Sequence, residues 1–183
     1  MLLRPYQEVA VSDACKALDK HNNTLIVAPT GAGKTIMLSA LVGKRHKKGK
    51  RVLVLQHRDE LVSQNKEKFE RVNPLISTSI VNGTVKHCEG DAVFSMVQTM
   101  SRDRNLRDRP LFDMVVIDEG HHAAAPTYTK VIDAVLKDNE RAEIVSFTAT
   151  PNRGDGKGLR GVFNNCAHQI ELATLIREGF LVR

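Results

Sequence analysis

Ala28-Pro-Thr-Gly-Ala-Gly-Lys-Thr35 is the stretch that decides the fold of this 183-residue chain. It matches the phosphate-binding loop pattern G-x-x-x-x-G-K-[ST], with Ala28 in place of the first glycine. An apolar, β-rich segment at 24–27 precedes the loop, and residues 34–42 have helical spacing. A strand, a glycine-rich loop and a helix are the context that such a loop requires. The alternative, a glycine turn with an incidental lysine, leaves these flanks unexplained.

The loop predicts a nucleotide site. Its backbone N–H groups and the N-terminus of the following helix would surround phosphates, and Gly31 and Gly33 permit backbone angles that a Cβ would forbid. Lys34 would reach the β- and γ-phosphates, and the Thr35 hydroxyl would ligate Mg²⁺. The predicted nucleotide-binding residues of the loop are Pro29, Thr30, Gly31, Ala32, Gly33, Lys34 and Thr35.

Length and composition indicate one α/β domain. The chain is 42% hydrophobic, and 183 residues suffice for a sizeable core. The sequence has no apolar run long enough to span a membrane and no long apolar stretch of a signal peptide near its N-terminus. We therefore expect a protein of the cytoplasm or the nucleoid, with no membrane partner.

Cysteine and histidine usage argues against a zinc site. The three cysteines are widely separated and odd in number, which favours a reducing compartment. The pairs His87-Cys88 and His121-His122 lack a second pair at zinc-binding spacing.

The formal net charge of +6 is compatible with a polyanionic partner but does not identify one. Much of it lies in residues 44–51, Lys-Arg-His-Lys-Lys-Gly-Lys-Arg. The favoured interpretation is a solvated helix end, where cations complement the helix dipole; a direct nucleic-acid contact is the alternative. The chain has no tryptophan, so a stacking platform for single-stranded bases is not indicated.

Helical and strand patterns alternate along the chain. The unbroken apolar runs at 52–55 and 114–117 suit parallel strands covered on both faces. We expect a charged loop or frayed helix end at 101–110 and a mobile loop at 151–161. The order predicts an α/β fold with a mostly parallel sheet, whose ligands collect at the carboxyl ends of the strands. Predicted strands lie at about 24–28, 51–56, 76–81, 91–95, 112–117 and 143–148, and predicted helices at about 5–21, 34–47, 58–71, 127–138 and within 171–180.

A second candidate site follows the strand predicted at 112–117. Asp118 and Glu119 come directly after this apolar run. Phosphoryl transfer to water needs a metal that neutralises phosphate charge and a group that orients the water. Asp118 would hold Mg²⁺ through a water molecule, and Glu119 would polarise the attacking water. The alternative is that the two acidic residues merely end a strand.

Together, residues 28–35 and Asp118-Glu-Gly-His121 resemble motifs I and II of superfamily 2 helicases and translocases. Further segments fall in the order of that family. Arg4-Pro-Tyr-Gln7 resembles the glutamine motif, residues 56–61 with Gln64 resemble motif Ia, residues 94–99 resemble a nucleic-acid-contacting segment, and Ser146-Phe-Thr-Ala-Thr150 resembles motif III. The resemblance covers essentially the whole chain and implies a three-layer RecA-like domain that binds ATP and Mg²⁺, with Arg4 and Gln7 at the adenine. Tyr6 would pack near the adenine or in the core.

The segments 148–159 and 175–183 are most similar to the branch that holds the XPB-like helicases and the helicase subunits of restriction enzymes. That branch works mainly on duplex DNA, so the resemblance implies DNA rather than RNA. Gly120 stands where the family usually has alanine. Glycine removes no chemical group, so we expect activity to survive it.

The resemblance also implies residue roles beyond the nucleotide. His121, Thr148 and Thr150 would couple hydrolysis to domain movement, although the threonines could simply cap a strand end; His122 is expected to be structural or exposed. Arg58 would contact a nucleic-acid phosphate or pair with a carboxylate. Gly83, Thr84 and Thr99 are lesser candidates for the phosphate track, where binding would be independent of sequence.

Residues 1–170 are expected to form the first RecA-like domain, and residues 171–183 to begin a linker to a second domain. The second domain of the family supplies arginine fingers, so this chain alone is expected to hydrolyse ATP poorly. Either the chain is a fragment or it is a small protein that borrows its second lobe. Three functions were weighed: a superfamily 2 DNA helicase or translocase domain (or its RNA counterpart), a P-loop ATPase of another class, and a regulatory module without catalysis. The intact Lys34, Thr35, Asp118 and Glu119 favour the first.

Overall fold

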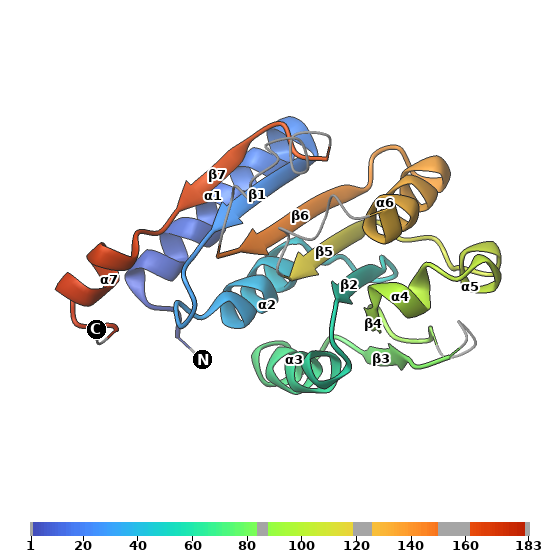
Figure 1. The fold of residues 1–183 in the computed structure, drawn as a ribbon, viewed down its shortest axis with the longest axis horizontal. Helices are drawn as coiled ribbons and strands as arrows, with labels where there is room; N and C mark the ends of the chain where they lie inside the picture. The colour runs from blue at the N-terminus through green and yellow to red at the C-terminus, as the bar shows by residue number, and fades with distance from the viewer. Residues whose placement is uncertain (1, 84–87, 119–125, 150–161, 182–183) are drawn as a thin grey trace.

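The computed structural model describes residues 2–83, 88–118, 126–149 and 162–181. Strands and helices alternate along these residues, with the strands laid across the molecule and β7 and β3 toward opposite ends (Figure 1). The strands are β1 (Asn23–Val27), β2 (Val52–Gln56), β3 (Thr78–Val81), β4 (Ala92–Met96), β5 (Met114–Asp118), β6 (Glu143–Thr148) and β7 (Cys166–Gln169). The helices are α1 (Pro5–His21), α2 (Lys34–Arg45), α3 (Asp59–Val72), α4 (Val97–Met100), α5 (Asp103–Arg107), α6 (Pro126–Asp138) and α7 (Leu172–Arg177).

The seven strands form one sheet in the order β3-β4-β2-β5-β6-β1-β7. Every neighbouring pair is parallel, which confirms the predicted parallel sheet. The strand ends are in register: Val27 of β1 lies beside Thr148 of β6, and Phe147 lies beside Asp118 of β5. The carboxyl ends of β1, β6 and β5 therefore form one continuous edge.

Helices cover both faces of the sheet, because successive strand residues point to opposite sides. Val52 and Val54 of β2 join a core with α1, α2 and α3, whereas Leu53 and Leu55 join a second core with α4, α5 and α6. The unbroken apolar run of β2 is thus buried on both sides, as its sequence predicts. The result is the expected three-layer α/β architecture.

The unpredicted elements are short or polar. β7 is a four-residue strand, Cys-Ala-His-Gln, at the edge of the sheet, and it carries no apolar run. α4 lies in the segment expected to contact nucleic acid, and α5 lies in the predicted charged segment 101–110. The predicted loop at 151–161 lies outside the described residues. No helix in the described part of the chain is long and apolar enough to cross a membrane.

Candidate active site and nucleic-acid interface

The loop between β1 and α2 lies at the carboxyl edge of the sheet. Its first residue, Ala28, donates its N–H to the Thr148 carbonyl at 2.9 Å, which fixes the loop to the end of β6. Gly31 and Gly33 have φ values of 89° and 84°, in the left-handed region that favours glycine. Gly33 is the N-cap of α2, so the first turn of this helix points its N–H groups into the loop. The backbone thus has the form of an anion site.

Helix α1 supports the loop from the outside. The Gln7 Nε2 atom donates to the Ala32 carbonyl at 3.0 Å, and its Oε1 atom accepts from the Arg4 N–H at 2.9 Å. The Tyr6 hydroxyl donates to the same Ala32 carbonyl at 2.9 Å. A Cβ on Gly33 would lie 2.5 Å from Nε2 at the end of the flexible Gln7 side chain, so the positive φ of Gly33, more than this contact, favours glycine here. The structure therefore places Gln7 and Tyr6 against the loop.

The tail beyond α7 also lies against this region. The Phe180 ring lies 5.0 Å from the Tyr6 ring and 5.0 Å from the guanidinium carbon of Arg4. Leu181 contacts the loop so closely that a Cβ on Gly31 would lie 2.9 Å from Leu181 Cδ2. The predicted adenine-side residues Arg4 and Gln7 are thus brought together with the last described residues of the chain.

A cavity of about 490 Å³ lies between the loop, α3 and the end of β5. This volume is ordinary for a small-molecule site. Lys34 and Thr35 line it from α2, and Asp118 lines it from β5 with only 7% of its surface exposed. The Thr35 hydroxyl and the Asp118 carboxylate are oxygen donors of the kind that Mg²⁺ prefers, and a nucleotide phosphate and water would complete its shell. The residues present therefore fit the predicted ion.

The predicted nucleic-acid residues lie along the same edge, after the strands β2, β3 and β4. Arg58 is exposed and is the N-cap of α3. Gly83 follows β3, and Thr99 in α4 follows β4. The Thr99 side chain is largely buried, with 7% of the residue exposed. One edge of the sheet thus carries both predicted sites, side by side.

Several predicted residues lie outside the described part of the chain: Thr84, Glu119, His121, His122 and Thr150. Thr148 is described and fully buried at the end of β6, where its carbonyl contacts the loop.

Comparison with known proteins decides the family. The family model described as the type III restriction enzyme, res subunit, matches residues 1–153. The chain belongs to this family. This match and the relatives named as helicases confirm the resemblance to a superfamily 2 helicase domain.

Two curated relatives of this res-subunit domain are named as helicases. The chain is 28% identical over 190 residues to irc3 of Schizosaccharomyces pombe, named as a candidate mitochondrial ATP-dependent helicase. The match includes 98% of this chain and 31% of irc3. The chain is 29% identical over 191 residues to the ATP-dependent RNA helicase DHX58 of Mus musculus, covering 90% of itself and 27% of DHX58. The chain thus spans less than a third of each relative.

A solved structure shares the fold of the res-subunit domain. The type ISP restriction-modification enzyme LlaGI, solved with a DNA substrate mimic, matches 98% of this chain and 21% of its own with a TM-score of 0.74. The two sequences are 16% identical, so this similarity concerns the fold alone.

Two polar residues of the res-subunit domain lie outside the motifs that the sequence indicates, and a third, Gln56, begins the segment that resembles motif Ia. Asn65 of α3 bonds to both Thr35 and Asp118. The Nδ2 atom of Asn105, a buried residue of α5, donates to the Gly83 carbonyl at 3.0 Å and to the Thr99 carbonyl at 2.7 Å. Gln56, at the end of β2, is fully buried, and neither polar atom of its side chain has a hydrogen-bond partner among the described residues. The hydrogen bonds of Asn65 and Asn105 join separate segments of the chain.

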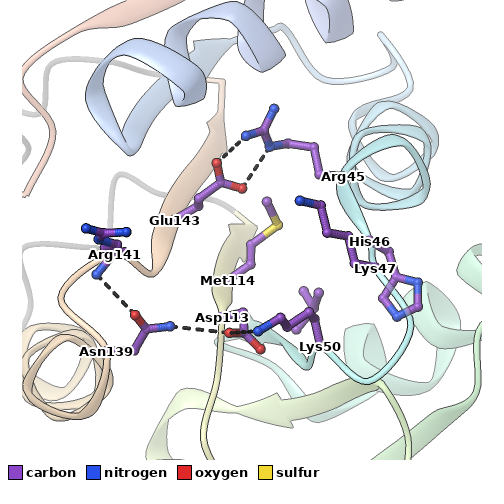
Figure 2. A pocket seen from close by; sticks show the side chains of 10 residues that line it. Arg45, His46, Lys47, Lys50, Asp113, Met114, Asn139, Arg141 and Glu143 are labelled. Carbon is purple, nitrogen blue, oxygen red and sulfur yellow. Dashed lines mark hydrogen bonds and ion pairs between the residues drawn. The ribbon is translucent and has the colours of Figure 1, made fainter.

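The basic segment 44–51 lies at the opposite, amino edge of the sheet. Helix α2 ends at Arg45, whose guanidinium Nε donates to Glu143 at 2.8 Å and whose Nη2 donates to Asp19 at 2.9 Å. Lys47 and Lys50 line a second cavity beside this pair, as Figure 2 shows. This arrangement supports the interpretation of a solvated helix end, with the segment far along α2 from the loop.

Proposed function

We propose that this chain is the ATP-binding and hydrolysing domain of a superfamily 2 DNA helicase or translocase, and that it couples ATP hydrolysis to movement on duplex DNA. The observation that carries the proposal is that the predicted nucleotide site and the predicted nucleic-acid residues lie at the same carboxyl edge of the sheet. The loop and Asp118 follow β1 and β5, while Arg58, Gly83 and Thr99 follow the adjoining strands β2, β3 and β4. A change at the phosphates therefore reaches the nucleic-acid side through adjacent strand ends.

In this proposal the residues have the following roles. Lys34 binds the β- and γ-phosphates, and the backbone of residues 29–33 surrounds them. Thr35 and Asp118 would hold Mg²⁺, which would supply charge neutralisation at the phosphates, and Glu119 orients the attacking water. Arg4 and Gln7 bind the adenine side.

The proposal extends to coupling and to nucleic acid. His121, Thr148 and Thr150 link the hydrolysis site to the domain movement. Arg58 and the segments at Gly83-Thr84 and Thr99 contact phosphates of the duplex. Such contacts are independent of sequence and weaken with salt. The DNA substrate mimic bound to LlaGI supports DNA as the partner.

Residues 1–170 form the ATP-binding domain in this proposal, and residues 171–183 begin a linker to a second RecA-like domain. That domain would supply arginine fingers, which raise phosphoryl-transfer rates by about 10³–10⁵. The contact of Phe180 and Leu181 with the loop region supports this linker as a route from nucleotide to second domain. The protein would act in the cytoplasm or at the nucleoid.

The test is ATP hydrolysis by the protein together with its second domain, with and without duplex DNA. We expect stimulation by duplex DNA that is abolished by Lys34→Ala and by Glu119→Gln. Turnover that responds to no nucleic acid would contradict the proposal. If only RNA stimulates hydrolysis, the proposed partner is RNA and not DNA. Because the relative DHX58 is named as an RNA helicase, the assay includes RNA as a separate condition.

A further inference from the structure

Asn65 joins the two residues that the proposed function assigns to Mg²⁺. Its Oδ1 atom lies 3.2 Å from the Thr35 hydroxyl, and its Nδ2 atom lies 3.0 Å from Asp118 Oδ2. The side chain is buried, with 3% of the residue exposed. Thr35 belongs to α2, Asp118 to β5 and Asn65 to α3, so one carboxamide ties three elements together at the cavity.

Chemistry settles the direction of both hydrogen bonds. A carboxylate only accepts, so the Asn65 NH₂ group must face Asp118 and its carbonyl oxygen must face Thr35. The Thr35 hydroxyl then donates its single proton to Asn65, which leaves its lone pairs for a cation. Asp118 Oδ2 accepts from Asn65 Nδ2, so Asn65 fixes the orientation of this carboxylate at the cavity. A carboxamide supplies the donor and the acceptor that this arrangement needs.

The place of Asn65 on its helix shows that packing alone does not require an amide. Asn65 follows Val62 by three residues and precedes Phe69 by four, and all three are buried. They form the stripe that α3 packs against the core. An apolar residue would fill this position without the cost of burying a polar group. The amide is therefore explained by its two partners.

We propose that Asn65 is a positioning residue for the Mg²⁺ site, and that it orients both Thr35 and Asp118 toward the ion. The role rests on the proposed function, because it presupposes Mg²⁺ and nucleotide in this cavity. Groups that hold metal ligands by hydrogen bonds typically change metal affinity by about 10–100-fold when they are removed. Asn65 is on the same helix as Arg58, so the metal site and the predicted nucleic-acid contact share one rigid element.

The test is the Mg²⁺ dependence of ADP binding by the 183-residue chain, measured with a fluorescent ADP analogue. Asn65→Leu keeps the side-chain size and removes both hydrogen bonds. We expect it to raise the Mg²⁺ concentration for half-maximal effect about 10–100-fold, while ADP affinity in EDTA stays within about twofold of wild type. Asn65→Ala, which cannot clash, is the second variant and should show the same shift.

Asn73→Ala is the matched control. Asn73 is also a carboxamide that ties α3 to α2, since its Nδ2 atom donates to the Ser39 carbonyl at 2.8 Å, but it does not line the cavity. It should lower stability without shifting the Mg²⁺ dependence. Two results would overturn the positioning role alone. In one, Asn65→Leu has the same Mg²⁺ dependence as a wild type that responds to Mg²⁺. In the other, Asn65→Leu loses ADP affinity equally in EDTA and in Mg²⁺. A wild-type chain whose ADP binding ignores Mg²⁺ would overturn the proposed function as well.

Discussion

Helix α2 begins at one cavity and ends at another of nearly the same volume, about 490 Å³ at its N-terminus and about 480 Å³ at its C-terminus. At the C-terminal cavity Arg45 and Glu143 form an ion pair (Figure 2), and Lys50 lies 3.8 Å from Asp113. Arg45 also pairs with Asp19. Asp113 accepts the Arg51 N–H at 3.0 Å. The hydrogen bond to Glu143 raises the pKa of Arg45 above its ordinary value, so Arg45 stays charged.

At the N-terminal cavity the polar groups are arranged for a ligand. Helix N–H groups, the Lys34 side chain and a buried carboxylate line the same space, with Asn65 holding Thr35 and Asp118. The helix dipole adds to the contrast, because it favours anions at the N-terminus and cations such as Arg45 at the C-terminus. The volume therefore does not distinguish the proposed ligand site from the hollow at the other end of α2, whereas the residues that line each cavity do.

Substitutions at the two ends of β5 should differ most in their effect on ATP hydrolysis. Asp118 ends this strand at one cavity, and Asp113 precedes it at the other. Asp118→Asn removes the charge that we propose holds Mg²⁺, and it should lower DNA-stimulated ATP hydrolysis about 10²–10³-fold, the range for a lost group that stabilises transition-state charge. Asp113→Asn should leave hydrolysis within about twofold and cost about 1 kcal/mol of unfolding free energy through weakened hydrogen bonds. Equal losses of hydrolysis in the two variants would break the comparison.

Arg45 should matter for stability and not for nucleotide. Its side chain is 17% exposed and that of Glu143 is 19% exposed, so Arg45→Ala leaves a largely buried carboxylate with its partner removed. We expect a loss of about 2 kcal/mol in urea unfolding, with unchanged ADP affinity. Lys47→Ala, an exposed cation near the same helix end, should stay within about 0.5 kcal/mol of wild type. Weakened ADP binding in Arg45→Ala would show that the amino edge also serves the ligand.

Substitution of Gln56 has the smallest expected effect, a small change in the free energy of unfolding. Its buried carboxamide lacks a hydrogen-bond partner in the described part of the chain, and an unsatisfied group costs free energy. Gln56→Met should therefore raise the unfolding free energy by about 1 kcal/mol. Gln64→Met, on the exposed side of α3, is the control and should change it by less than about 0.5 kcal/mol. A destabilised Gln56→Met would show that the amide is satisfied in solution.

Local patterns account for the parts of the domain that could be predicted. The apolar runs of β2 and β5 reveal buried parallel strands because both of their faces are covered. The loop at 28–35 reveals a phosphate site because strand, glycines, lysine and helix are consecutive. β7 is not predictable from its sequence, because its four residues, Cys-Ala-His-Gln, form neither an apolar run nor an alternating pattern.

Asn65 and Asn105 show why the rest could not be predicted. Helical spacing from Val62 and Phe69 places Asn65 on the buried side of α3, yet its partners lie 30 and 53 residues away in the chain. Asn105 bonds to Gly83, which lies 22 residues earlier in the chain, and to Thr99, which lies 6 residues earlier. Such partners depend on how the helices pack on the sheet, and no spacing within one segment encodes that packing.

A crystal structure of the chain with ADP and Mg²⁺ tests the central claim most directly. The account predicts the diphosphate on the backbone of residues 31–35 and the metal ion between Thr35 and Asp118, with Asn65 still bonded to both residues. Nucleotide bound among Arg45, Lys47 and Lys50, or a metal ion distant from Asp118, would contradict it.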